Sequence, residues 1–491
     1  LLINQSLMTN VFPSKLKIAK IMPLLKKPNI FTPDNFRPIS LLPCISKIIE
    51  KCVFKQIFEY FEENKLLYSS QYGYRKNHST ETACLELIDK LYKQLDDNKS
   101  PFCVFIDLSK AFDTINHNIL LAKLKYYGFD QNALSWLKSY LADRKQFVEV
   151  DGYKSETNFI KTGVPQGSTL GPLLFIIYMN DINSVSDSLS SILFADDTSL
   201  NSTISLFQSR DSRDLSFKIN SELFKVTDWL RANKLSLNAK KTKFMQFRYS
   251  QMKPTSLPKL SLKMDGVVID KVDTFNFLGL TISETLSWKH HIEKVRIKIS
   301  KIVGVMSRIK YQVSSKILLT IYNSLILSHL HYGILCWGFQ CKGLFTIQKK
   351  AIRIICKAKY NAHTDKLFKS LNLLKVDDIF KLQCLKFYYR LRKNILPLYF
   401  SSNFRFTRNA DVHDRQTRYG NVFRLERVNR MSTRQSIRHH LPNLLNNTSE
   451  MIINSMNTIS LLSFKKRAKK LYISEYSEEC NKPNCYICNR Q

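Results

Sequence analysis

The chain has 491 residues, of which 75 are Lys or Arg and 40 are Asp or Glu, so its formal net charge is +35. A field this positive attracts polyanions, namely nucleic acids or anionic membrane surfaces. The basic residues run through the whole chain instead of forming one juxtamembrane cluster, which favours nucleic acid and no membrane partner. With 44% hydrophobic residues the chain can bury a sizeable core, and its length suggests several domains.

The beginning of the sequence and its cysteines bear on the cellular setting. The first residue is Leu, so we expect the C-terminal part of a longer protein. No secretory signal pattern opens the chain. Most of the eleven cysteines stand singly in apolar stretches, as at Cys44, Cys52, Cys84 and Cys103. This usage is typical of reduced core thiols in an intracellular protein and argues against a disulfide-rich secreted one.

Hydrophobic periodicity predicts alternating strands and helices over the first 180 residues. The elements expected in chain order are strands and loops over 15–43, helices over 45–67 and 80–97, a strand over 102–106, helices near 116–126 and 130–141, a polar hairpin turning at Asp151-Gly152, and an apolar helix entered through 162–172. Because both types mix and the apolar strands end in acids, we expect an α/β (α+β) enzyme rather than a bundle.

The second half of the chain becomes helical beyond about residue 283, which is the expected domain boundary. The uncharged stretch 317–339 is long enough to span a bilayer but carries Asn323, Ser324 and two histidines, so we expect a buried helical hairpin, with a membrane span as the alternative. Residues 401–450 contain nine Arg and no Lys. This composition suits RNA, and disorder is the competing interpretation.

Three acids follow apolar strands and are the candidates for chemistry. Asp107 follows FCVFI, and Asp196 and Asp197 follow ILFA. Three carboxylates in one cleft would force a proton onto one of them unless divalent cations were bound. Magnesium takes such oxygen ligands, and two ions can support an in-line phosphoryl displacement. The alternative is solvated or helix-capping acids, which we favour for Asp113 but not for the other three.

A glycine-rich loop lies between the acids, in TGVPQGSTLGPLLFIIYM, residues 162–179. It is not a phosphate-binding P-loop, because no G-x-x-x-x-G-K-[ST] is present. Its glycines let the backbone approach a ligand closely, and Gln166 can both donate and accept hydrogen bonds. A capped helix start is the equally weighted alternative.

Seven ordered blocks resemble the motifs of reverse transcriptases, most closely those of non-LTR retrotransposons of the LINE type, Jockey-like. They are NFRPISLLPCISKIIEK, SSQYGYRKNHSTETA, FIDLSKAFDTINH, TGVPQGSTLGPLLF, LFADDTSL, NKLSLNAKKTKFMQF and FNFLGLTI. The resemblance covers about 15–282. It implies a right-hand polymerase fold with fingers and palm over 1–282, a helical thumb over 283–370 and a basic C-terminal region over 371–491, which is a candidate for nucleic-acid binding.

The resemblance also implies roles for the metal-binding residues. Asp107 would be the metal-binding acid of the first palm strand, with the Leu108 carbonyl available to a second ion. Asp196 would be the principal ligand of the hairpin and Asp197 its less direct partner. The cofactor expected is Mg²⁺, as two ions, with Mn²⁺ as a substitute. Phe194 stands where tyrosine is common in the family, and we infer no inactivation from it.

Further roles follow for substrate contacts. Phe112 matches the steric gate against a ribose 2′-OH, and Gln166 and Gly167 would lie near the incoming nucleotide and template. Arg37 would meet the triphosphate, with Arg75 a weaker candidate. A lysine, Lys240 or Lys241, would protonate pyrophosphate.

The C-terminal cysteines Cys480, Cys485 and Cys488 provide three of the four ligands that a structural zinc site needs. We therefore favour no zinc there, with a zinc site as the alternative. The expected partners are an RNA template, a DNA primer or target DNA, and dNTPs. The family's endonuclease is expected upstream, and the expected location is the nucleus or a cytoplasmic ribonucleoprotein.

The leading hypothesis is an RNA-directed DNA polymerase. A decayed or domesticated element protein that binds RNA without polymerising is the alternative from another class. A palm-type RNA polymerase is the third hypothesis, and Phe112 argues against it because such an enzyme must admit the 2′-OH.

Overall fold

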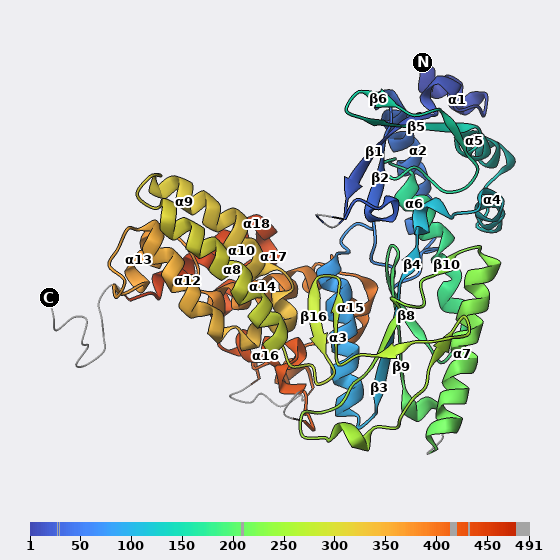
Figure 1. Ribbon diagram of the computed structural model, residues 1–491. Coiled ribbons are helices and arrows are strands. Elements are labelled where there is room, and N and C mark those ends of the chain that lie inside the picture. Colours follow the sequence, from blue (N-terminus) through green and yellow to red (C-terminus); the bar gives the residue numbers. More distant parts are fainter. Residues whose placement is uncertain (27, 29, 208–210, 413–419, 431–432, 478–491) are drawn as a thin grey trace. The chain divides into compact units, whose positions relative to one another are not determined.

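The computed structural model describes residues 1–491 except 27, 29, 208–210, 413–419, 431–432 and 478–491. Its chain packs into two compact units that interleave along the sequence (Figure 1). Unit 1 comprises Leu1–Ser79, Phe102–Phe244 and Pro258–Lys271, and unit 2 comprises Thr80–Pro101, Met245–Leu257 and Val272–Gln491.

Unit 1 contains the mixed α/β part of the chain. Its helices are α1 (Leu2–Met8), α2 (Cys44–Glu63), α4 (His117–Tyr126), α5 (Gln131–Leu141), α6 (Gly171–Tyr178) and α7 (Ser212–Ala232). Its strands are β1 (Ile18–Leu25), β2 (Phe36–Leu41), β3 (Pro101–Ile106), β4 (Leu108–Ser109), β5 (Arg144–Val150), β6 (Tyr153–Lys154), β7 (Asn158–Ile160), β8 (Ser190–Phe194), β9 (Asp197–Thr203), β10 (Ser236–Leu237), β12 (Lys263–Met264), β13 (Val267–Val268) and β14 (Asp270–Lys271), with β11 (Lys243–Gln246) crossing from unit 1 to unit 2.

The central sheet positions the candidate acids. Its strand order is β14-β11-β3-β9-β8, so β3 lies between β11 and β9. All six residues of β3 are buried, as its continuous apolar sequence predicts. Figure 1 shows α7 alongside this sheet, and Ile219, Leu223 and Val226 of α7 belong to the same buried core as Phe102 and Val104 of β3. The end of β3 is therefore held rigidly.

A second sheet carries the basic strand β2. In it β1 pairs antiparallel with β2 and parallel with β5, and β5 and β6 form the expected hairpin. The turn of this hairpin uses positive φ at Asp151 (49°) and Gly152 (87°), as the Asp-Gly signal predicts. Arg37 lies on β2, opposite Leu24 of β1.

Unit 2 is mainly helical. Its elements are α3 (Thr80–Asp96), the hairpin β15 (Thr274–Phe277) and β16 (Leu280–Ser283), and the helices α8 (Lys289–Ile309), α9 (Ser315–Ile321), α10 (Leu327–His331), α11 (Ile334–Trp337), α12 (Lys342–Ile355), α13 (Asp365–Ser370), α14 (Val376–Arg392), α15 (Leu398–Asn403), α16 (Ile437–Asn446), α17 (Glu450–Thr458) and α18 (Leu461–Ser474). Helix α14 packs against α10, α11, α12, α16 and α18, so it is the central helix of the unit.

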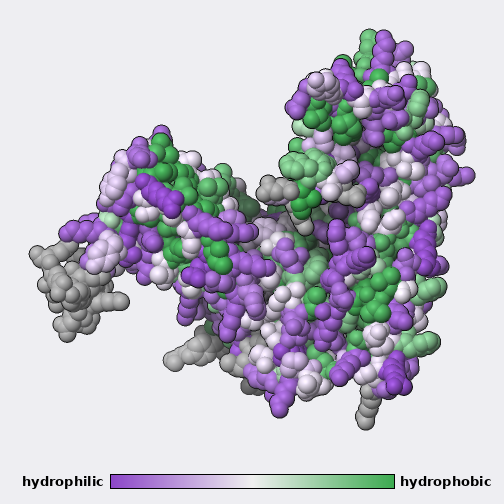
Figure 2. Space-filling view, viewed as in Figure 1, coloured by the Kyte–Doolittle hydropathy of each residue, from purple (hydrophilic) through white to green (hydrophobic). Residues whose placement is uncertain are grey.

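The predicted fold class is correct, but the packing does not follow the predicted boundaries. Unit 2 takes helix α3 from the first third of the chain and does not separate 283–370 from 371–491, because α14 packs against helices from both ranges. The predicted functional division into fingers and palm, thumb and basic region stays a prediction. Figure 2 shows hydrophilic side chains spread over the visible face of each unit.

The stretch predicted as a buried hairpin is a bent helix pair. No single helix among the described residues is long and apolar enough to cross a bilayer, although Ser315–His331 and Ile334–Gln340, bent by 54°, pass that test together. The bend follows from Gly333, whose φ is 62°.

The eight cysteines within the described residues are free thiols. Five of them are buried as predicted, whereas Cys44 at the start of α2 is exposed. Cys480, Cys485 and Cys488 lie outside the described residues.

Candidate active site

The central sheet brings the three predicted acids together. Asp107 directly follows β3, and Asp197 begins the neighbouring strand β9. Asp196 and Asp197 form the end of the β8–β9 hairpin, in which Phe194 pairs with Asp197. The apolar strands thus bring three carboxylates to the ends of neighbouring strands on one side of the sheet, as predicted.

The carboxylates repel one another. The pKa of Asp197 is raised to about 6, first by burial and then by the charges of Asp196 and Asp107. The pKa of Asp196 is also raised by burial and by Asp107, while Arg37 opposes the shift. Asp196 and Asp197 are nevertheless exposed as whole residues, so water screens part of this repulsion and weakens the effect of burial on both carboxylates. The site holds negative charge that a cation would stabilise.

The carboxylates of Asp107, Asp196 and Asp197 are chemically suited to bind a hard divalent cation. As the side chains lie, no group of three or more His, Cys, Asp or Glu residues within the described part of the chain is arranged to hold a metal ion. The three acids are nevertheless oxygen donors that lie near one another, since the charge of Asp107 raises the pKa values of Asp196 and Asp197. Carboxylate oxygens are the ligands that Mg²⁺ and Mn²⁺ prefer.

The turn that carries Asp196 is strained. Ala195 has a φ of 56°, a left-handed conformation that costs a non-glycine residue roughly 1–2 kcal/mol. A Cβ at Gly73 would lie 2.5 Å from the Ala195 nitrogen, so only glycine fits beside the turn. The Oε1 of Gln71 accepts hydrogen bonds from the backbone N–H of Gly73 (2.8 Å) and of Ala195 (3.5 Å). The neighbouring segment therefore holds the turn in its strained form.

Backbone hydrogen bonds complete this brace. The Tyr72 N–H donates to the Leu193 carbonyl at 2.7 Å, and the Leu193 N–H donates to the Ser70 carbonyl at 3.0 Å. We call residues 70–73 the hairpin brace. Sequence reasoning placed SSQYGYRK among the motifs but missed this role, because only the fold places residues 70–73 beside β8. Tyr74 also lies near the acids, since burial and the charge of Asp196 raise its pKa.

The loop that contains Asn238 and Thr242 anchors Asp107. Its carbonyl accepts the N–H of Asn238 at 2.9 Å, and its N–H donates to the Thr242 hydroxyl at 3.3 Å. The loop brings Lys241 Nζ to 3.8 Å from Asp107 Oδ2. Of the two lysines that the sequence left undecided, Lys241 is therefore the one whose ammonium group is seen beside a candidate acid.

The glycine-rich loop packs against the segment that follows Asp107. The Val164 N–H donates to the Phe112 carbonyl at 2.9 Å, and Gln166 Nε2 donates to Asp113 Oδ1 at 3.2 Å. A Cβ at Gly163, whose φ is 84°, would lie 2.7 Å from the Asp113 backbone. Asp113 therefore positions Gln166, which goes beyond the capping role favoured for it from the sequence.

Phe112 has a fixed orientation. Its ring stacks on Phe175 of α6 with centroids 4.6 Å apart and an interplanar angle of 23°. The start of α6 is held in turn by the buried carboxylate of Glu50, which accepts the N–H groups of Thr169 (2.6 Å) and Leu170 (3.3 Å). Glu50 was not singled out from the sequence, where it is one charge on an amphipathic helix.

Strand β2 borders the same loop. The Ser40 N–H donates to the Gln166 carbonyl at 2.7 Å, and a Cβ at Gly167 would lie 2.6 Å from the Ser40 carbonyl oxygen. This contact places the β2 strand with Arg37 at the loop, and the charge of Arg37 acts on Asp196. Arg37, Gln166, Gly167 and the acids therefore belong to one site.

Arg75 is engaged elsewhere. Its guanidinium forms a two-point ion pair with Glu62 of α2, with Nε 2.7 Å from Oε1, and also donates to the Tyr68 carbonyl at 2.9 Å. Its side chain is only 11% exposed. The predicted triphosphate contact of Arg75 stays a prediction, and the geometry gives it a structural role in holding the hairpin brace.

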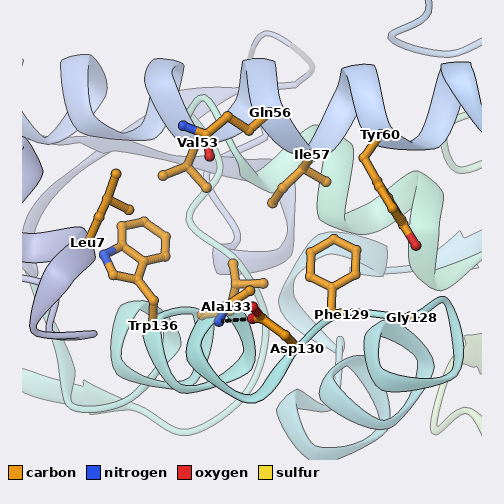
Figure 3. A pocket seen from close by; sticks show the side chains of 11 residues that line it. Leu7, Val53, Gln56, Ile57, Tyr60, Gly128, Phe129, Asp130, Ala133 and Trp136 are labelled. Atoms are coloured by element: carbon orange, nitrogen blue, oxygen red, sulfur yellow. Dashed lines mark hydrogen bonds between the residues drawn. The ribbon is translucent and has the colours of Figure 1, made fainter.

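An apolar hollow of about 300 Å³ lies between α2 and α5, away from these residues (Figure 3). Figure 3 shows Val53, Ile57 and Tyr60 of α2 facing Phe129 and Trp136, with Asp130 capping the start of α5. No predicted site residue lines it.

Comparison with known proteins now identifies the family. The model of the family described as reverse transcriptase (RNA-dependent DNA polymerase) matches residues 25–282, more than half of the chain. The chain belongs to the reverse transcriptase family. The match includes every residue predicted for the site, from Arg37 to Asp197.

Curated relatives are similar over most of this chain. The probable RNA-directed DNA polymerase from transposon BS of Drosophila melanogaster is 28% identical over 419 residues, which cover 80% of this chain and 44% of the relative. The RNA-directed DNA polymerase from mobile element jockey of the same organism is 27% identical over 414 residues, covering 81% and 44%. The predicted resemblance to Jockey-like reverse transcriptases is confirmed, and the chain spans less than half the length of these relatives.

Among solved structures, apo telomerase from Candida tropicalis is similar with a TM-score of 0.40 and 13% identity, covering 79% of this chain and 67% of that one.

Replacing Gly73 tests the hairpin brace. We expect Gly73→Ala to weaken binding of Mn²⁺ roughly tenfold, because the added Cβ displaces the turn that carries Asp196. Electron paramagnetic resonance of Mn²⁺ titrated into the protein measures this. Gly304→Ala in α8 is the control, since nothing lies within 4 Å of a Cβ there. Unchanged Mn²⁺ affinity in Gly73→Ala would show that the brace does not position the acids.

The raised pKa of Asp197 predicts a pH-dependent stability. A carboxyl whose pKa rises on folding favours the folded state while protonated, and this contribution is lost as pH rises through about 6. In EDTA we therefore expect Asp197→Asn to have a higher Tm than the parent chain at pH 7.5, with the difference shrinking as pH falls toward 4. Thermal unfolding followed by circular dichroism measures this, with the exposed Asp187→Asn as control. A lower Tm for Asp197→Asn at pH 7.5 would contradict the repulsion.

Proposed function

We propose that this chain is the polymerase part of a non-LTR retrotransposon protein and that it extends a primer 3′-OH with dNTPs along an RNA template. The observation that carries the proposal is the convergence of Asp107, Asp196 and Asp197 at the ends of the neighbouring strands β3, β9 and β8, where burial and the neighbouring acids raise the pKa values of Asp196 and Asp197. Membership of the reverse transcriptase family supports the same reaction.

The three acids and the Leu108 carbonyl would hold two Mg²⁺ ions, and Mn²⁺ would substitute. When bound, such ions stabilise the attacking and leaving oxygens of a phosphoryl transfer. Asp107 is held for this role by Asn238 and Thr242, and Asp196 by the hairpin brace. Rigid placement matters because the reaction is catalysed mainly by positioning and charge.

The remaining residues would bind the nucleotide. Arg37 offers a guanidinium to the triphosphate, and Lys241 offers an ammonium proton to the leaving pyrophosphate. The Phe112 ring, fixed on Phe175, would exclude a ribose 2′-OH. Gln166, oriented by Asp113, would contact the nucleotide and template.

The remaining parts of the proposal concern the portion of the full-length protein that this chain does not span. We propose that an endonuclease belongs to the portion of the full-length protein that this chain does not span, and that a DNA target supplies the primer. An intracellular site of action, in the nucleus or in a cytoplasmic ribonucleoprotein, goes with this proposal.

Primer extension on an RNA template tests the function. With dNTPs and Mg²⁺ we expect extension by the parent chain and at least a roughly hundredfold loss in Asp196→Asn, because one carboxylate ligand is removed. Gel analysis of a labelled DNA primer measures the rate. Asp187→Asn, an exposed acid of the same unit, should keep full activity. No extension by the parent chain with either Mg²⁺ or Mn²⁺ would leave the alternative of an RNA-binding protein that does not polymerise.

A separate experiment tests whether Phe112 is the steric gate that excludes ribonucleotides. We expect Phe112→Val to extend the primer with rNTPs at least roughly tenfold better relative to dNTPs than the parent chain, since the smaller side chain admits the 2′-OH. The ratio of kcat/KM for rNTPs and dNTPs measures this. Unchanged discrimination would show that Phe112 is not the gate.

A further inference from the structure

Helix α18 is seated firmly in unit 2 by one face. Phe464, Ala468 and Tyr472 are buried, and the ring of Phe464 stacks on Tyr389 of α14 with centroids 5.4 Å apart. The Tyr389 hydroxyl donates to the Ile459 carbonyl, which fixes the approach to the helix, and Ser460 caps its first turn. The helix is therefore a built part of the unit rather than a loose tail.

The other face of α18 carries uncompensated positive charge. The sequence KKRAKK places five cations within residues 465–470. At helical spacing, four of them form two adjacent rows, Lys465 with Lys469 and Lys466 with Lys470. Within the residues that the structure describes, none of these four forms an ion pair. Lys465 and Lys469 are half-buried, and Lys466 and Lys470 are exposed.

A fifth lysine from α14 joins the same cluster. Lys386 donates to Gln383 Oε1 at 2.9 Å, and Gln383 Nε2 lies 2.9 Å from His331 Nδ1. Burial and the charge of Lys465 lower the pKa of both Lys386 and Lys469. Glu81 is the acid that opposes this shift at Lys386. The charge of Lys465 thus acts on both Lys386 and Lys469, and a bound anion would relieve this repulsion.

The arginine-rich segment offers a contrast. Arg438 forms a two-point ion pair with the buried Asp89, with distances of 2.6 and 2.7 Å, and lies over Phe404. Arg430 lies 4.4 Å over the ring of Tyr249. These guanidinium groups are occupied inside unit 2, so the composition that suggested RNA binding in the sequence partly reflects internal packing.

We propose that Lys386, Lys465, Lys466, Lys469 and Lys470, the α14–α18 lysine surface, bind the phosphodiester backbone of the RNA template. The choice of RNA as the ligand of this surface rests on the proposed function. Residues four apart on a helix lie about 5–6 Å from each other, so the two rows present repeated cations to successive phosphates. Lysines contact phosphates as point charges, and phosphate contacts carry no sequence information, so we expect binding that is independent of sequence.

Two other occupants fit less well. An amphipathic helix binds a membrane by inserting its apolar face, and the apolar face of α18 is already buried against α14. A run of basic residues such as KKRAKK is also commonly interpreted as a nuclear localisation signal. The side chains of α18 instead stand on a packed helix, which favours a folded nucleic-acid surface.

The test measures RNA binding apart from polymerisation. All variants are made in the full chain carrying Asp196→Asn, and anisotropy of a labelled 30-nucleotide RNA of mixed sequence gives Kd between 50 and 200 mM salt. We expect K466Q/K470Q and K465Q/K469Q each to bind roughly tenfold more weakly and to lower the salt slope by about 1.4, which is two phosphate contacts on a single strand. The control R424Q/R427Q removes two exposed arginine charges from the arginine-rich segment.

The outcomes separate the alternatives. Circular dichroism and Tm establish that each variant folds, and the exposed pair K466Q/K470Q alone tests the surface if K465Q/K469Q unfolds. Equal loss in R424Q/R427Q, or no loss in K466Q/K470Q, would overturn the proposal. So would lysine-dependent binding that is tighter to duplex DNA or to phosphatidylserine vesicles than to the RNA. Lysine-dependent RNA binding in a chain whose parent extends no primer would support the surface and overturn the polymerase function instead.

Discussion

Repulsion among three carboxylates is the constraint on which the candidate site depends. Asp107, Asp196 and Asp197 are brought to one edge of a buried sheet, where burial and mutual charge raise the pKa values of the two hairpin acids. Such an arrangement persists only because the surrounding backbone is held from several sides. Keeping these like charges together lowers the stability of unit 1, and perturbed pKa values of this kind are characteristic of functional sites.

The supports of the acids come from segments that are far apart in sequence. Residues 70–73 hold the hairpin, and the loop around Asn238 and Thr242 holds the end of β3. The glycine-rich loop joins Phe112 to β2 through hydrogen bonds at Val164 and Ser40. Each support uses mainly backbone groups, so the acids, Phe112 and Gln166 are fixed relative to one another within one unit.

The acids and most elements could be predicted from the sequence because their signals are local. An apolar strand followed by Asp, an Asp-Gly turn and helical periodicity are all readable within about ten residues. The roles of Gln71, Gly73, Glu50 and Thr242 could not be predicted in this way, since their partners lie between 119 and 135 residues away. The interleaving of α3 into unit 2 was missed for the same reason, and the two-point pair of Arg438 with Asp89 spans 349 residues.

The left-handed turn at Ala195 ties the hairpin acids to a position far away in the sequence. The turn fits only while a glycine 122 residues upstream leaves room for it. Under the proposed function, a single change at position 73 would therefore disable the polymerase while all three acids remain unaltered, so the presence of the acids alone does not establish that a copy of the gene encodes a competent enzyme.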